Sequence, residues 1–176
     1  MGRYDIKNIL LYANSFLYNT RNVGGYVSKA VNIRISGIQR DISDEPTIIE
    51  CTGSFHSDSK LHYIRYTDSD GIKNLIKIKP GHAIVSRSGA LSSVMEFIEG
   101  SRSECVYPTP YGHFDTIIET EYVRIADSEV LSGMPLANSS GNNDVVSPFA
   151  QIKYNLSMNG QKISGCELNI YLSDLS

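Results

Sequence analysis

From residue 31 onward, apolar and polar residues alternate with a period of two, and this alternation limits the possible folds more than any other feature. Val31, Ile33 and Ile35, for example, alternate with Asn32 and Arg34. Successive side chains of a β-strand point to opposite faces of a sheet, so each such segment presents one apolar face. The pattern predicts further strands near 47–55, 60–68, 72–79, 82–87, 92–99, 102–107, 113–126, 148–158 and 162–173.

Short turn signals join these segments one after another. They are "DSDG" at 68–71, "KPG" at 79–81, "RSGALS" at 87–92 and "MNGQ" at 158–161. Such signals are typical of antiparallel hairpins, because Asn and Gly adopt the positive φ angles of tight turns. Many short hairpin strands predict a mainly β protein, either a sandwich or an up-and-down barrel of about eight to ten strands. Hairpin-after-hairpin order favours the barrel, since closure removes exposed sheet edges.

Two segments lack the period of two. In residues 5–19 apolar residues recur at helical spacing, which predicts an amphipathic helix, and "RNVGGY" at 21–26 reads as a hinge. We therefore divide the chain into a helical extension at 1–26 and one β-barrel domain at 27–176. The helix is expected to pack on the domain, with partner docking as the alternative. Polar, glycine-containing residues 127–147 predict a long flexible loop or a lid over a pocket.

Composition and charge exclude several classes of partner. The 176 residues are 41% apolar and 20% charged, with a net charge of −3 and no long basic run, so neither nucleic acid nor an anionic membrane is an expected partner. The apolar N-terminal run is too short and too polar to span a bilayer. Three cysteines, Cys51, Cys105 and Cys166, lie far apart inside predicted strands. We interpret them as reduced core residues of a cytoplasmic protein.

The stretch "YPTPYGHFDTIIETEY" at 107–122 combines prolines, aromatics and a histidine. Pro108 and Pro110 both lack the N–H group on one strand edge, which therefore cannot pair there. Gly112 permits a bend, so the segment is interpreted as a strand corner. Before it, Tyr107, Thr109 and Tyr111 should share one face. After it, alternation places Phe114, Thr116, Ile118, Thr120 and Tyr122 inside and Asp115, Ile117, Glu119, Glu121 and Val123 outside.

Together, "RSGALSSVMEFIEG" (87–100) and "YPTPYGHFDTIIET" (107–120) resemble segments of the YwiB-like family of uncharacterised bacterial proteins. The hairpin "IKYNLSMNGQKISGCELNIYL" is similar in pattern. The resemblance covers about residues 28–174 without the 127–147 loop. It implies a small barrel of the calycin or lipocalin type, and it implies no activity, cofactor or site residue.

No motif for metal binding or catalysis is found. His56, His62, His82 and His113 show no metal-ligand spacing, and no nucleotide-binding or nucleophile motif occurs. The glutamates near the corner fall on predicted solvent faces. We therefore expect no catalytic residue, no metal and no cofactor.

Six residues are candidate ligand-binding residues. Arg87 lies at a strand end, where its guanidinium could bind a carboxylate or phosphate; alternatively, it bonds backbone carbonyls or pairs with a glutamate such as Glu96. Tyrosines supply apolar walls with polar tips, although packed core or rim positions are the alternative. The candidates are Arg87, Tyr107, Thr109, Tyr111, Tyr122 and Tyr154.

These observations favour a non-enzymatic barrel that binds a small, partly apolar molecule with an anionic end facing Arg87. A barrel of this size can hold one small ligand. One alternative is a protein-interaction module that uses the N-terminal helix or an open strand edge near Pro108. An enzyme of unrecognised type is the second alternative, and the sequence leaves open whether the chain forms a homodimer.

Overall fold

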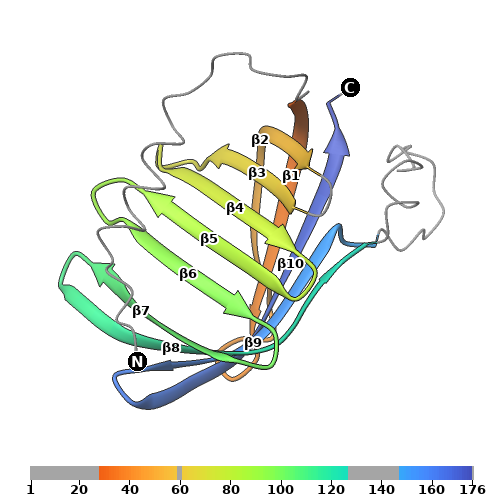
Figure 1. The fold of residues 1–176 in the computed structure, drawn as a ribbon. Coiled ribbons are helices and arrows are strands. Elements are labelled where there is room, and N and C mark those ends of the chain that lie inside the picture. The colour runs from red at the N-terminus through yellow and green to blue at the C-terminus, as the bar shows by residue number, and fades with distance from the viewer. Residues whose placement is uncertain (1–27, 59–60, 127–146, 176) are drawn as a thin grey trace.

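The computed structural model describes residues 28–58, 61–126 and 147–175, which form ten antiparallel strands (Figure 1). The strands are β1 (Lys29–Gln39), β2 (Thr47–Asp58), β3 (Leu61–Thr67), β4 (Lys73–Lys79), β5 (His82–Ser88), β6 (Ser93–Ile98), β7 (Arg102–Thr109), β8 (Gly112–Ile125), β9 (Ala150–Met158) and β10 (Gln161–Asp174). The predicted helix at 5–19 and nearly all of the predicted loop at 127–147 lie outside the described residues. The described residues contain no helix long and apolar enough to cross a membrane.

The strands form one sheet that curls into a nearly closed barrel. Their order is β6-β5-β4-β3-β2-β1-β10-β9-β8-β7. Except for β6 and β7, strands that follow each other in sequence are neighbours, and β1 pairs with β10 to join the two ends of the series. The predicted mainly β, antiparallel barrel is therefore confirmed at this level. One expected hairpin is missing, because β6 and β7 are consecutive in sequence yet form the two edges of the sheet.

We call the line between β6 and β7 the seam. The two strands are joined by a short turn and run alongside each other without pairing (Figure 1). At the joined end, the Gly100 N–H donates to the Thr120 carbonyl (2.9 Å) and the Thr120 N–H donates to the Ser101 carbonyl (3.0 Å). Further along, the Ser103 hydroxyl donates to the Glu96 carbonyl across the seam. The seam is thus fastened near the β6–β7 turn; we call the other end, where no hydrogen bond joins β6 and β7 among the described residues, its open end.

Apolar side chains fill the middle of the barrel. The largest fully buried ones come from six different strands: Ile64, Ile76, Ile78, Phe97, Ile118, Ile152 and Ile170. The ring of Phe97 on β6 contacts that of Tyr154 on β9, with 4.9 Å between centroids, and so joins the two halves of the barrel. Burying a side chain of this size contributes roughly 1.5–3 kcal/mol, which makes these contacts the main source of stability.

The structure confirms the predicted turns and inward faces of most strands. Asn74, Ile76 and Ile78 are buried on β4, and Ala150, Ile152 and Leu156 are buried on β9. In the turns, Gly71 and Gly81 each have a φ of 76°, as tight turns require. The predicted Asn-Gly turn is also present, with φ angles of 49° at Asn159 and 78° at Gly160.

The expected alternation on β8 is wrong beyond Thr120. The register with β9 shifts between Thr120 and Tyr122, so that Tyr122 pairs with Lys153 and Val123 pairs with the buried Ile152. A β-bulge of this kind inserts one extra residue and exchanges the two faces of the strand after it. Val123 is therefore buried, whereas the Tyr122 ring stacks under the guanidinium of Arg124 at 4.1 Å.

We predict that Gly53→Ala strongly destabilises the protein. Gly53 lies inside β2, and a Cβ atom there would stand 2.2 Å from the Arg65 carbonyl oxygen and 2.5 Å from Ile33 Cδ1. Relief of that overlap requires the strands to move apart, so the free energy of unfolding should fall by at least about 2 kcal/mol in urea titrations.

The matched control is Gly37→Ala on the neighbouring strand. Its nearest contact would be Leu168 Cδ1 at 3.8 Å, an ordinary van der Waals distance. A change of less than about 1 kcal/mol is expected for Gly37→Ala. Equal effects of the two substitutions would show that the close packing of β2 on β3 is not as described.

Candidate functional site

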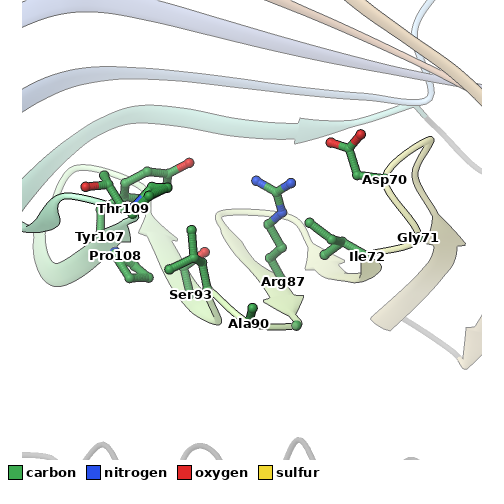
Figure 2. Close-up of a pocket in the computed structure, with 12 residues that line it drawn as sticks. Asp70, Gly71, Ile72, Arg87, Ala90, Ser93, Tyr107, Pro108 and Thr109 are labelled. Atoms are coloured by element: carbon green, nitrogen blue, oxygen red, sulfur yellow. The ribbon is translucent and has the colours of Figure 1, made fainter.

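A cavity of about 620 Å³ lies at the open end of the seam; we call it the mouth cavity. Its walls come from the β3–β4 turn, the end of β5, the β5–β6 turn and the end of β7. The lining residues are Asp70, Gly71, Ile72, Arg87, Gly89, Ala90, Leu91, Ser93, Tyr107, Pro108, Thr109 and Pro110. Figure 2 shows Arg87 in the middle of the cavity, with Asp70 on one side and Tyr107 and Thr109 on the other.

The register of the sheet places Arg87 and Ser93 side by side at this level of the barrel. Gly53 pairs with Tyr66, Tyr66 with Asn74, Asn74 with Arg87, and Arg87 with Ser93, so these residues form one inward row across five strands. The neighbouring row consists of larger apolar residues: Phe55, Ile64, Ile76, Val85 and Met95. Of these two rows, Arg87 and Ser93 line the mouth cavity.

Arg87 is incompletely satisfied in this row. Its Nη2 atom lies 3.5 Å from Asp68 Oδ2, at the outer limit for a hydrogen bond. Its Nε atom is buried and has no hydrogen-bond partner among the described residues. A guanidinium carries five N–H donors and stays charged, so this arrangement leaves capacity to bind an anion. The alternative pairing with Glu96 is wrong, because Glu96 bonds His82 at 2.8 Å.

Asp68 is mainly an anchor of the β3–β4 turn. Its Oδ1 atom accepts hydrogen bonds from the backbone N–H groups of Ile72 (2.9 Å) and Asp70 (3.1 Å). Its Oδ2 atom accepts from Asn74 Nδ2 at 3.3 Å. The bond from Ile72, followed by those from Asn74 and Asp70 and by the charge of Arg87, lowers the pKa of Asp68. Asp68 is therefore ionised, but its carboxylate already accepts hydrogen bonds from Ile72, Asp70 and Asn74. It is for this reason a weak counter-ion for Arg87.

The hydroxyl of Tyr66 stays protonated at the inner side of this cluster. Burial, together with the nearby Cys51 and Asp68, raises the pKa of Tyr66 to about 12, although Arg87 acts in the opposite direction. Burial also raises the pKa of the Cys51 thiol. Arg87 and Asp68 are accordingly the charged side chains of this cluster at neutral pH.

The stretch at 107–112 forms the wall across the seam. The expected strand corner is a tight hairpin, in which Thr109 pairs with Gly112 and Pro108 pairs with His113. The Thr109 hydroxyl donates to the Gly112 carbonyl (3.0 Å), and Gly112 has a φ of 134°. The turn therefore holds Pro108 and Pro110 at the cavity edge.

The structure brings together three of the six candidate ligand-binding residues. Arg87, Tyr107 and Thr109 line the mouth cavity. Tyr111 is 99% exposed at the tip of the hairpin, Tyr122 lies on the outer face, and Tyr154 packs against Phe97. Burial and the neighbouring Cys166 thiol raise the pKa of Tyr154.

Sequence reasoning missed the acidic partner of Arg87. "DSDG" was interpreted only as a turn, although an aspartate at the first position of a turn often accepts backbone N–H groups. That signal could identify Asp68 as an anchor. It could not place Asp68 beside Arg87, which is nineteen positions away in the sequence.

Neither the mouth cavity nor the described residues as a whole contain a group suited to metal binding. No cluster of three or more His, Cys, Asp or Glu side chains occurs within the described part of the chain. Among the twelve residues that line the cavity, hydroxyl groups are present and histidine is not. The lining therefore provides one cation (Arg87), one carboxylate (Asp70), hydroxyl groups and an apolar surface.

Comparisons with known proteins identify a family and a fold. Residues 31–170 match the family model described as "Domain of unknown function (DUF1934)". The fold is similar to the crystal structure of the YwiB protein from Bacillus subtilis, with a TM-score of 0.59 and 16% identity over 85% of this chain and 94% of that chain. No curated protein matches the chain. The resemblance to YwiB-like proteins is thus confirmed.

We predict that Asp68 makes stability depend on pH in the acidic range. Its folded-state pKa lies below the ordinary value of 3.8, so the ionised carboxylate stabilises the fold above that pH. This contribution is lost as the pH falls through the lowered folded-state pKa. The difference in unfolding free energy between wild type and Asp68→Asn should therefore shrink between about pH 5 and about pH 2.

Urea titrations at several pH values measure this difference. Asp70→Asn is the control, because Asp70 is an exposed residue of the same turn. A difference between wild type and Asp68→Asn that stays constant over the acidic range would contradict the assigned role of Asp68.

Proposed function

We propose that this chain, which belongs to the DUF1934 family of domains of unknown function, binds a small molecule with an anionic head and an apolar body in the mouth cavity. The family description assigns no activity, so the proposal depends on the geometry of the cavity. The observation that carries it is the position of Arg87, which lines a cavity of about 620 Å³, meets Asp68 only at 3.5 Å and has a buried Nε atom without a hydrogen-bond partner among the described residues.

The chemistry of Arg87 favours a carboxylate as the anionic head. A guanidinium binds a carboxylate through two parallel N–H···O bonds, which is stronger and more directional than binding through one donor. The present partner, Asp68, meets it through one long contact of 3.5 Å. A ligand carboxylate with better geometry would therefore improve the hydrogen bonding of Arg87.

The remaining walls suit an apolar body. Ile72, Ala90, Leu91, Pro108 and Pro110 line the cavity, and Leu91 is 37% exposed. A ligand that covers these side chains removes apolar surface from water, which contributes roughly 25 cal/mol per Å² before the cost of association. The volume also lies within the range of about 300–1,000 Å³ that is usual for small-molecule sites.

Binding is preferred over catalysis because the lining offers no activated group. Ser93, Tyr107 and Thr109 carry hydroxyls, and the cavity lining contains no histidine that could act as their base. The Thr109 hydroxyl is engaged in the β7–β8 turn. These features support a binding site of the kind expected for a small β-barrel.

We predict that Arg87→Gln weakens the binding of carboxylates at least tenfold. A charged hydrogen bond contributes about 1.5–3 kcal/mol, and about 1.4 kcal/mol corresponds to a factor of ten. Hexanoate and 3-phenylpropionate serve as probes, each compared with its neutral amide by calorimetry or ligand-observed NMR. Asp68→Asn should strengthen binding, because it removes the competing negative charge.

Arg65→Gln is the matched control. It removes the same charge, but Arg65 lies on the outer face of β3, where it stacks on Tyr63 at 5.7 Å. The affinity of the Arg65→Gln variant for the probes should stay within about threefold of that of wild type. The proposal fails if no carboxylate binds, or if Arg87→Gln and Arg65→Gln have equal effects.

A further inference from the structure

The free edge of β6 supplies a second recognition element beside Arg87. The Glu99 N–H donates to the Gly81 carbonyl (2.9 Å), which extends the β5–β6 register and shows that odd-numbered residues of β6 turn their backbone groups toward β5. Antiparallel strands alternate, so even-numbered residues of β6 turn theirs toward the seam. Accordingly, the Glu96 carbonyl is the group that the Ser103 hydroxyl reaches across the seam.

Val94 is the next even-numbered residue toward the mouth cavity. Its N–H and C=O groups face the seam, and no strand of the described part of the chain pairs with β6 on that side. Ser93, its neighbour, lines the cavity. A backbone donor and a backbone acceptor therefore lie next to Ser93, which belongs to the cavity wall.

The opposite edge, β7, lacks one of its backbone donors beside the cavity. The Thr120 N–H donates to the Ser101 carbonyl (3.0 Å), so odd-numbered residues of β7 turn their backbone groups toward β8 and even-numbered ones face the seam. Pro108 is even-numbered, and its nitrogen carries no hydrogen. A strand in the seam therefore finds a backbone donor at Val94 on β6, whereas Pro108 on β7 cannot donate to it.

We propose that the mouth cavity takes the C-terminal residues of an extended peptide, whose main chain pairs with Val94 and whose terminal carboxylate binds Arg87. This inference deepens the proposed function and rests on it for the role of Arg87. Addition of a strand to an open sheet edge, and capture of a terminal carboxylate, are established modes of peptide recognition.

Three features favour a peptide terminus over other anions. Arg87 and Ser93 are direct cross-strand partners, so one ligand can reach the guanidinium and the β6 edge together. The cavity volume of about 620 Å³ suits a few residues of chain. Leu91, Pro108 and Pro110 offer an apolar surface for one side chain of the peptide.

The test uses the full chain and N-acetyl-Val-Val-Leu with a free carboxylate. The same peptide with a C-terminal amide in place of the carboxylate should bind at least tenfold more weakly than the acid. Arg87→Gln should remove this difference in affinity between the acid and the amide. The three backbone amides are N-methylated one at a time. Methylation of the amide that pairs with Val94 should weaken binding at least tenfold, whereas methylation of a neighbouring amide should change it by less than about threefold, because alternate amides of a strand point to opposite sides.

The possible results separate the peptide inference from the proposed binding of carboxylates on which it rests. If the acid binds better than the amide and all methylated peptides bind alike, the strand pairing is wrong and the carboxylate site stands. If hexanoate binds and the peptide does not, the peptide inference is overturned and the proposed function stands. If neither binds, or if Arg87→Gln leaves binding of the acid unchanged, both are overturned.

Discussion

The pairing of β1 with β10 is the constraint on which the rest of the structure depends. It runs from Val31 opposite Asp174 to Gln39 opposite Cys166, and it joins the two ends of a series of hairpins into one curved sheet. Closure satisfies the backbone groups of both strands and brings the apolar faces of the two halves together. Phe97 and Tyr154, from opposite halves, meet only because of it.

The same closure determines where the barrel stays open. With β1 and β10 paired, the free edges of the sheet are β6 and β7, which follow each other in sequence. Their short turn fastens one end to β8 through Gly100, Ser101 and Thr120, and Pro108 removes a donor at the other end. The mouth cavity lies at the open end of this seam. The proposed binding role of Arg87 follows from its position at that end.

Much of the fold follows from local features of the sequence. The period of two identifies the strands and most of their inward faces, because side-chain direction within a strand is fixed by the backbone. Gly71, Gly81 and the Asn159–Gly160 pair identify turns, because few other residues adopt positive φ at low cost. The inward position expected for Tyr122 is wrong for a physical reason. A β-bulge depends on how β8 meets β9, and nothing local marks it.

The residues of the candidate site likewise divide into those that can be selected from the sequence and those that only the structure identifies. Arg87, Tyr107 and Thr109 could be selected from sequence because each combines suitable chemistry with a strand end, whereas Tyr111 and Tyr154 had the same chemistry in other surroundings. Asp68 could not be selected, since its effect on Arg87 arises from the register that places Asn74 opposite Arg87.

The sequence by itself determined the strands, the turns and the chemical character of each face, because these depend on residues close together in the chain. Only the tertiary structure decided that β1 closes on β10, that β6 and β7 stay unpaired, and that Arg87 lines a cavity while its Nε atom has no partner among the described residues. These features depend on strand register and on the balance of packing over the whole sheet, and both are properties of contacts between residues distant in sequence.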